Sequence, residues 1–357
     1  MKYFYILVIL IGSIMHLYAN ETTLEKVSLQ LQWKHQFEFA GFYAAKEKGF
    51  YKDAGLDVNF IEFNENTNIV DEVLSERAEY GVGYSSIILD YIQKKPIVFM
   101  ANFFKQSPLV LVTQKEITSL SGLRGARVEG LSNNIDNITL FTMLNKFGIT
   151  SLDFETVPPT FSIDAFLNKE IDAMSVFTTN ELFLLNEAGA EYNIFDPLSY
   201  GAKYYDVNLF TSLNELKEHP ERVKKFKDAS IKGWEYALEN KQEIVEVILK
   251  KYNSQKKSKK SLEFESYQVE SLMLPRVHKV GSIDKVKVKM IAENFIQSRF
   301  ISLKKMPSFD KFYIDNRNHT SALTQSEQNY LQEKQVLTIC IDPSWMPIEA
   351  VVDSKHV

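Results

Sequence analysis

The sequence predicts an α/β protein made of two lobes, with the chain passing from the first lobe to the second and back. Short apolar stretches of strand length alternate with amphipathic stretches of helical period, which is typical of α/β sheets. This alternation occurs in two successive series, and a further strand-like segment follows the second series. The chain has 357 residues, 45% of them hydrophobic, and this length fits about two domains or lobes.

The first series begins with residues 27–33, where apolar side chains occupy every second position, as in a half-buried strand. Residues 41–49 follow as a helix with one apolar and one charged face, and Gly49 ends it. Further strands are predicted at 56–63, 80–84 and 97–104, and helices at 68–77 and 87–93. Because strands and helices alternate, we expect parallel strand pairing.

The second series has predicted strands at 109–113, 126–129, 154–157, 173–177 and 192–195, and helices at 138–147, 162–168 and 181–187. Residues 204–212 are a predicted strand that returns to the first lobe, and the segments 213–252 and 264–300 are predicted helices that pack on it. The lysine-rich residues 250–260 between them are expected to be a solvated loop.

This order places lobe one at 27–107 plus 205–302 and lobe two at 108–204, with crossings near 105–109 and 201–208. Two crossings between two α/β lobes form a hinge, and a hinged cleft is suited to enclosing a small molecule.

The first 19 residues have the three parts of a secretory signal peptide. Lys2 supplies a positive charge, residues 3–17 are apolar, and Ala19 is a small residue at the expected cleavage point. The apolar run is shorter than the roughly 20 residues that span a bilayer. We therefore expect a periplasmic protein, with tethering to the inner membrane by an uncleaved segment as the alternative.

Composition excludes several classes of function. The net charge of -5 does not fit a nucleic-acid-binding protein, which needs a strongly basic face. A single cysteine, Cys340, excludes disulfides within the chain and sites built from several cysteines. No HExxH, glycine-rich phosphate loop or GxSxG motif is present, so the sequence predicts no catalytic residue and no metal ligand.

Ligands of open α/β sheets bind beyond the carboxyl ends of the strands, beside helix N-termini. In lobe one this rule selects Trp33, whose ring can stack on a planar ligand, and Tyr84, Ser85 and Ser86, which offer hydroxyl and N–H groups at a helix start. The alternatives are that Trp33 belongs to the core and that the serines only cap the helix.

In lobe two the same rule selects polar residues after two strands: Asn133, Asn134, Thr178, Thr179, Asn180 and Glu181. The Glu181 carboxylate can accept hydrogen bonds from an exocyclic amine. Alternatively, Thr178 caps a helix and Glu181, three residues later, completes a capping box. Tyr205, on the return crossing, either closes over the ligand or lies in the core.

Four stretches resemble the thiamine-pyrimidine synthase-like family of solute-binding proteins: LQWKHQFEFAGFYAAKEKGFYKDAGLDVNF, GVGYSSIIL, SLSGLRGARV and AMSVFTTNE. The resemblance covers about residues 27–300, and the family includes relatives that bind sulfonates, nitrate and formylaminopyrimidine. It implies a type II periplasmic-binding-protein fold and a pyrimidine-like ligand, a thiamine precursor, stacked on aromatic rings. The tryptophan of the family motif corresponds to Trp33, its glycine to Gly41 and the acid of the second lobe to Glu181.

One position departs from the family pattern. Many pyrimidine-binding members have a histidine two residues before the motif glycine, where this chain has Phe39, so the resemblance makes Phe39 a candidate ligand-binding residue. The synthases of the family use that histidine as a reactant and carry a cysteine-rich iron motif. The alternative activity is a thiamine pyrimidine synthase that forms hydroxymethylpyrimidine phosphate from pyridoxal phosphate and histidine, with pyridoxal phosphate and iron as cofactors. We expect instead a solute-binding protein without a cofactor. A third possibility is a structural or partner-binding protein with an empty cleft.

The C-terminal stretch LTQSEQNYLQEKQVLTICIDPSWMPIEAV resembles a linker helix followed by the first strand of an amino-acid-type solute-binding domain. Such tandem domains occur in membrane-bound sensor kinases and diguanylate cyclases. The resemblance implies a linker helix at 303–335 and a truncated start of a second domain at 336–357. The expected partners are a small-molecule ligand and either an ABC permease or a downstream membrane-bound kinase or cyclase.

Overall fold

The computed structural model describes residues 23–64, 67–132, 137–160, 162–298, 301–302, 306–314, 351–352 and 355–356. The chain forms two compact units, Met1–Ile314 and Asp315–Val357. In the second unit, strands β11 (Val351–Val352) and β12 (Lys355–His356) pair antiparallel. The predicted signal peptide at 1–19 lies outside the described residues, as do residues 315–335 of the predicted linker helix and most of the predicted second domain.

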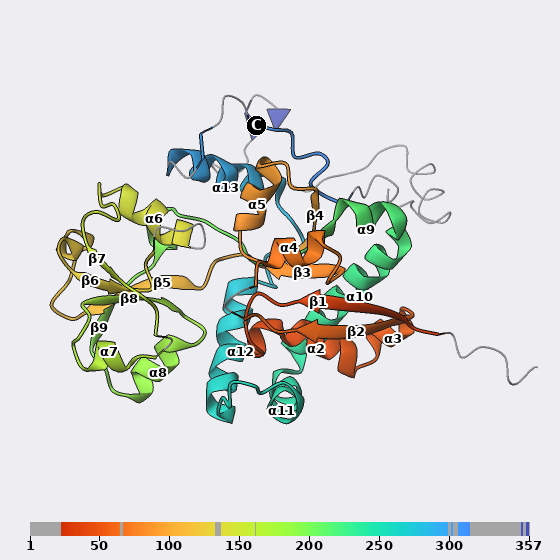
Figure 1. Ribbon diagram of the computed structural model, residues 1–357, viewed down its shortest axis with the longest axis horizontal. Coiled ribbons are helices and arrows are strands. Elements are labelled where there is room, and N and C mark those ends of the chain that lie inside the picture. Colours follow the sequence, from red (N-terminus) through yellow and green to blue (C-terminus); the bar gives the residue numbers. More distant parts are fainter. Residues whose placement is uncertain are drawn as a thin grey trace, which may run out of the picture. The chain divides into compact units, whose positions relative to one another are not determined.

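The first unit contains two five-stranded sheets, both shown in Figure 1. The first has the order β2-β1-β3-β10-β4, and its strands are β1 (Glu25–Gln30), β2 (Leu56–Ile61), β3 (Tyr80–Gly83), β4 (Ile97–Phe104) and β10 (Asp206–Ser212). The second has the order β7-β6-β8-β5-β9, and its strands are β5 (Leu109–Gln114), β6 (Arg127–Glu129), β7 (Glu155–Val157), β8 (Ala173–Phe177) and β9 (Tyr192–Phe195). We use lobe one for the described residues of 23–104, 206–298 and 306–314, and lobe two for those of 109–195.

Each sheet has one strand that runs against the others. The parallel pairing expected for the first series is confirmed for β1 with β2 and β3, and the exceptions are the returning strand β10 and the first strand of lobe two, β5. β10 is antiparallel to β3 and β4, and β5 is antiparallel to β8 and β9. The cause is the path of the chain. β4 leaves lobe one at Phe104, and β10 enters at the same edge, where Asp206 pairs with Phe104. A strand that enters where its neighbour leaves must run in the opposite direction.

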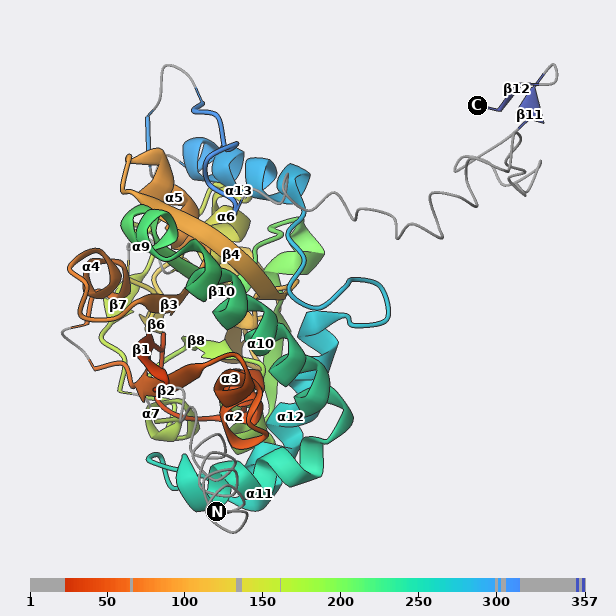
Figure 2. The same ribbon diagram turned by 90° about the vertical axis from the view of Figure 1, so that its right-hand side faces the viewer.

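Helices cover both faces of the lobe-one sheet (Figure 1). One face packs on α2 (Ala40–Glu47), α10 (Pro220–Glu239), α11 (Lys241–Lys251) and α12 (Lys259–Met273). The other face packs on α4 (Ile69–Leu74), α5 (Ser86–Ile92) and α13 (Lys285–Gln297). The remaining lobe-one helices are η1 (Phe37–Phe39), α3 (Phe50–Asp53) and α9 (Leu213–Glu218). Figure 2 shows α2 and α3 beside α10. Among the described residues, no helix is both long and apolar enough to cross a membrane.

Lobe two is covered in the same way. Its sheet packs on α6 (Ile138–Asn145) on one side and on α7 (Asp164–Leu167) and α8 (Glu181–Glu187) on the other, so each side has an apolar core of its own. Short 3-10 helices lie at Leu120–Leu123 and Pro197–Tyr200.

Helices α2 and α10 approach each other closely because each has a glycine at their contact. A Cβ atom on Gly233 would lie 2.0 Å from the carbonyl oxygen of Gly41, and one on Gly41 would lie 2.0 Å from Cγ of Trp234. Gly41 therefore lets the indole ring of Trp234, which is fully buried, pack directly on the α2 backbone.

Residues 306–314 lie on lobe one. The Phe99 N–H on strand β4 donates to the carbonyl oxygen of Phe312 at 2.6 Å, and Phe99 also forms a parallel bridge with Tyr313. The ring of Phe312 packs on Tyr91 at 4.4 Å between centroids. These contacts cover the free edge of β4, so this segment is part of lobe one, where the sequence predicted a linker helix.

Candidate functional site

A cavity of about 600 Å³ lies between the two sheets. Its wall is built mainly from residues that follow strands or begin helices, as the strand-end rule expects. The polar and aromatic lining residues on the side of lobe one and the crossings are Trp33, Gln36, Phe63, Thr67, Asn68, Tyr84, Ser85, Ser86, Asp90, Ser107, Tyr205, Asp206 and Phe210. Those on the side of lobe two are Glu129, Asn137, Thr139, Ser162, Ser175, Phe177, Asn180 and Glu181.

Two stacked aromatic rings form part of the lobe-one wall. Trp33 follows β1 and Phe63 follows β2, and because these strands are parallel neighbours their ends lie side by side. The two rings are 5.3 Å apart between centroids with an angle of 22° between planes. Both side chains are half-buried. A planar ligand can extend this stack.

The first turn of α5 contributes hydroxyl groups, but one of them is already used. Ser85 Oγ donates to the carbonyl oxygen of Tyr205 at 2.8 Å and accepts from the Tyr205 N–H at 3.0 Å. Ser85 thus holds the return crossing in place. The Tyr205 hydroxyl accepts from the Asp284 N–H at 3.0 Å, in lobe one. Tyr84 contacts Phe177 of lobe two edge to face, at 6.5 Å between centroids.

Glu129, the last residue of β6, supplies an acceptor to the lobe-two wall. Its Oε1 accepts from the N–H of Thr160 at 2.7 Å and from its hydroxyl at 2.8 Å. The residue is only 3% exposed, and its Oε2 is buried as well. This oxygen nevertheless has no hydrogen-bond partner among the described residues. A buried carboxylate oxygen without a donor is unfavourable, and a ligand N–H placed there would remove that penalty.

Asn180 and Glu181 lie at the start of α8. Glu181 Oε2 accepts from the Phe177 N–H at 2.8 Å, and Glu181 Oε1 accepts from Asn180 Nδ2 at 2.6 Å. The N-cap of α8 is Asn180, so the alternative in which Thr178 caps this helix is wrong. Thr178 instead donates its N–H to the carbonyl oxygen of Pro108 on the outward crossing at 2.9 Å.

The structure brings together seven of the predicted site residues in the cavity wall: Trp33, Tyr84, Ser85, Ser86, Asn180, Glu181 and Tyr205. Four others lie elsewhere. Phe39 is fully buried in the lobe-one core, Gly41 packs on Trp234, and Thr178 and the buried Thr179 do not line the cavity. Asn133 and Asn134 lie outside the described residues.

Sequence reasoning missed Glu129, Asp206, Gln36 and Phe63 as site residues. The first two had a signal, because Glu129 ends a strand and Asp206 begins one. Phe63 also had one, because the predicted strand at 56–63 ends there.

A buried carboxyl group lies below the lobe-one wall. Glu38 is 1% exposed and accepts from the amides of Gln32 and Gln36, and Gln32 also donates to Asp206 Oδ1 at 2.8 Å. Burial raises the pKa of Glu38 to about 8, and the negative charges of Asp206 and Glu265 act in the same direction. The Glu38 carboxyl group therefore holds its proton at neutral pH.

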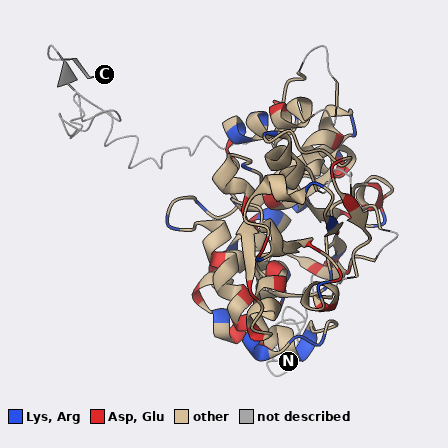
Figure 3. Ribbon diagram, turned by 90° about the vertical axis from the view of Figure 1, so that its left-hand side faces the viewer, with Lys and Arg blue, Asp and Glu red and all other residues tan. Residues whose placement is uncertain are grey.

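The charged residues of the cavity wall have one sign. Acidic and basic residues are intermixed along the described ribbon (Figure 3), but the described lining residues include Asp90, Glu129, Glu181 and Asp206 and no lysine, arginine or histidine. Helix N-termini at the wall contribute partial positive charge, which is smaller than the full charge of a carboxylate. The wall therefore favours ligands with N–H donors over anions.

The same lining residues do not fit pyridoxal phosphate and iron. Pyridoxal phosphate is held as a Schiff base by a lysine, and none lines the described wall. Among the described residues no group of three or more His, Cys, Asp or Glu side chains is placed to hold a metal ion.

The chain is similar in sequence to two proteins named for the ligands that they bind. The formylaminopyrimidine-binding protein of Halalkalibacterium halodurans is 25% identical over 239 residues, which cover 65% of this chain and 72% of that protein. The riboflavin-binding protein RibY of Chloroflexus aurantiacus is 24% identical over 245 residues, covering 64% of this chain and 67% of that protein.

Among solved structures, the putative periplasmic sulfonate-binding protein SsuA of Methylobacillus flagellatus superimposes with a TM-score of 0.61 at 14% identity, covering 90% of this chain and 99% of that one. This likeness confirms the predicted periplasmic-binding-protein fold. A family profile described as NMT1/THI5 like matches residues 36–244, more than half of the sequence. The chain belongs to the NMT1/THI5-like family.

Proposed function

We propose that this protein is a periplasmic solute-binding protein that encloses a planar, amine-bearing heteroaromatic molecule, of the pyrimidine class, in the cleft between its lobes. The observation that carries this proposal is the cavity of about 600 Å³ with a stacked aromatic pair on one wall and a buried, unpaired carboxylate oxygen on the other. Pockets of about 300–1,000 Å³ are typical of small-molecule sites.

The aromatic pair selects the shape of the ligand. The rings of Trp33 and Phe63 are nearly parallel, with 22° between their planes, so a flat ring placed against them continues the stack. Such stacking contributes about 0.5–1.5 kcal/mol beyond the burial of apolar area.

The polar groups select the hydrogen-bonding pattern of the ligand. Glu129 Oε2 needs a donor, which an exocyclic amine supplies. The acidic wall opposes sulfonate, nitrate and phosphate groups, because no described lining side chain carries a positive charge. The relatives named for formylaminopyrimidine and riboflavin binding support a planar nitrogen heterocycle, and a thiamine precursor is the proposed physiological ligand.

The two crossings support closure by hinge motion. Residues 105–108 and 196–205 are the connections between two sheets whose cores are largely separate, with Ile138 of α6 packing on the side of lobe one, so the lobes can rotate about them. The partner then recognises the closed, ligand-bound form, and the proposed partner for uptake is an ABC permease.

Isothermal titration calorimetry with the purified protein tests the proposal. The probes are a 4-aminopyrimidine, riboflavin, an alkanesulfonate and nitrate. We expect heat and thermal stabilisation from the aminopyrimidine and none from the two anions. Binding of the alkanesulfonate, with no response to either heterocycle, would overturn the proposed ligand class.

The variant Glu129→Gln sharpens this test. The glutamine oxygen keeps the hydrogen bonds from Thr160, while its amide replaces the free acceptor with a donor. We expect a loss of about 1.5–3 kcal/mol of binding free energy for the aminopyrimidine. The matched control is Glu155→Gln, on the exposed part of β7, which should bind as the wild type does.

A further inference from the structure

Helix α12 of lobe one makes a direct contact with the start and one face of helix α8 of lobe two. Lys257 Nζ, just before α12, donates to Asn180 Oδ1 at 2.6 Å. The ring of Phe264 packs on Phe183 at 5.4 Å between centroids, and Lys260 pairs with Glu187 at 2.8 Å. The partners in each lobe are spaced three and four residues apart, so each helical segment presents one face to the other.

Lys257 is the buried member of this contact. Its side chain is only 7% exposed, whereas that of Lys260 is 70% exposed. Its Nζ also lies 3.2 Å from Oε2 of Glu265, a fully buried carboxylate whose Oε1 accepts from the Glu38 N–H at 2.9 Å. The sequence predicted a solvated lysine here. Removing an ammonium group from water is unfavourable unless it finds acceptors, and here two lie within hydrogen-bond distance, Asn180 Oδ1 from lobe two and Glu265 Oε2 from lobe one.

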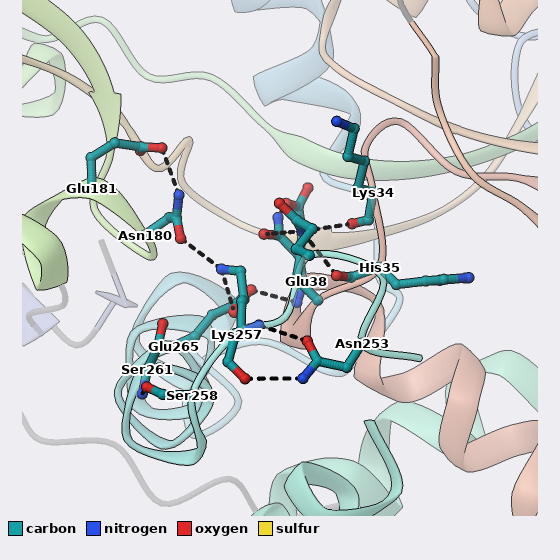
Figure 4. Close-up of polar contacts among 12 residues, drawn as sticks. Lys34, His35, Glu38, Asn180, Glu181, Asn253, Lys257, Ser258, Ser261 and Glu265 are labelled. Atoms are coloured by element: carbon teal, nitrogen blue, oxygen red, sulfur yellow. Dashed lines mark hydrogen bonds and ion pairs between the residues drawn. The ribbon is translucent and has the colours of Figure 1, made fainter. Parts of the chain in front are cut away.

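The ammonium group determines which way the Asn180 amide faces. An ammonium group has only donors, so the atom of Asn180 that faces Lys257 must be the oxygen. The NH₂ group then faces Glu181, where Nδ2 donates to Oε1 at 2.6 Å (Figure 4). Both neighbours impose the same orientation. One N–H bond of Asn180 is used by Glu181, and the other has no acceptor among the described protein residues.

Asn180 also lines the cavity, so this orientation is part of what the ligand meets. On the foundation of the proposed function, we propose that Lys257 is a positioning residue that makes Asn180 a hydrogen-bond donor to the ligand when the lobes are together. The ligand then presents an acceptor, such as a ring nitrogen, to Asn180 and a donor to Glu129. Without Lys257 only the hydrogen bond to Glu181 holds the amide, so the turned amide becomes more populated and the preference for that acceptor falls.

The test compares two ligands with three variants of the full chain. The ligands are a 4-aminopyrimidine and the aminopyridine in which one ring nitrogen is replaced by C–H. Lys257→Met keeps most of the unbranched side chain, one atom shorter, but removes its donors, and Lys257→Arg keeps donors. Lys260→Met is the matched control, because it removes the exposed pair with Glu187 and leaves Asn180 untouched.

We expect the wild type to prefer the pyrimidine by about 5- to 10-fold, the value of one neutral hydrogen bond. Lys257→Met should lower that preference, because only Glu181 still holds the amide, whereas Lys257→Arg should keep most of the preference and Lys260→Met all of it. A purely structural role of Lys257 would weaken both ligands equally and leave the ratio unchanged, and that result overturns the proposal. Asn180→Asp keeps an oxygen towards Lys257 but has no donor, so it should lose the preference. If Lys257→Met does not fold, this variant tests whether residue 180 donates to the ligand.

A measurement without ligand separates this proposal from the proposed function. The side-chain amide signals of Asn180 in the ¹H–¹⁵N spectrum, assigned by their absence in Asn180→Asp, should shift in Lys257→Met and stay in place in Lys260→Met. Signals that do not respond to Lys257→Met overturn the positioning role even in a protein that binds pyrimidines. Signals that respond as expected support the positioning role even where the wild type binds neither ligand and the proposed function fails.

Discussion

Replacing Gly41 by alanine should destabilise lobe one without changing the ligand site. The added Cβ would lie 2.0, 2.2 and 2.4 Å from three atoms of the Trp234 ring, far inside van der Waals contact. The indole is fully buried and is surrounded by the rings of Phe42, Phe103 and Phe104, whose centroids lie 5.9, 5.2 and 6.1 Å away. The ring therefore has no open space into which it can move.

The magnitude follows from two opposing effects. Overpacking of a rigid core costs about 1–3 kcal/mol, and a clash of this depth belongs at the upper end. Alanine in place of glycine inside a helix such as α2 stabilises the helix by about 1 kcal/mol. We expect Gly41→Ala to lower the free energy of unfolding by about 2 kcal/mol or more.

Urea denaturation followed by circular dichroism measures this change as a lower midpoint at constant slope. A double-mutant cycle with Trp234→Phe gives the control, because a smaller ring should remove much of the cost of the alanine. The family resemblance assigned Gly41 to the ligand site. A Gly41→Ala protein of unchanged stability and weakened ligand binding would support that role and refute the packing argument.

Three other changes give distinct results. Trp33→Ala should weaken aminopyrimidine binding by about 1–3 kcal/mol in calorimetry, and an unchanged affinity would remove Trp33 from the site. Ser85→Ala should lower the free energy of unfolding by about 1–2 kcal/mol, because both hydrogen bonds to the Tyr205 backbone are lost. The neighbouring control Ser86→Ala should leave the free energy of unfolding unchanged, and an equal decrease in both variants would contradict the role of Ser85. The unfolded chain loses the Glu38 proton near pH 4.5, whereas the folded protein holds it up to about pH 8, so the stability of the wild type falls as pH rises through this window. Glu38→Gln removes this titration, and its stability should therefore depend less on pH between about 4.5 and 8. Parallel pH profiles of wild type and Glu38→Gln would show that Glu38 has no raised pKa.

The order of secondary structure could be predicted from the sequence because local patterns determine it. The predicted bounds of β4, β8 and α8 agree with the structure, since each is an uninterrupted apolar or amphipathic run with a clear end. The reversed direction of β5 and β10 was not predicted, because strand direction depends on where the chain re-enters a sheet.

The candidate site could be predicted only in part. Strand ends led to Trp33 and Glu181, which line the cavity. The use of the Ser85 hydroxyl by Tyr205, and the burial of Lys257 beneath Asn180, depend on contacts between distant parts of the chain. Neither contact leaves a local pattern in the sequence.

The interior position of β10 has a consequence for the order in which the two lobes fold. Lobe two takes all its strands from residues 109–195, so a contiguous stretch of chain completes its sheet. The N-terminal sheet is different, because β3 and β4 are joined through β10, about a hundred residues later in the chain. Until residues 206–212 insert between them, the facing edges of β3 and β4 have unpaired backbone groups that can pair with other chains.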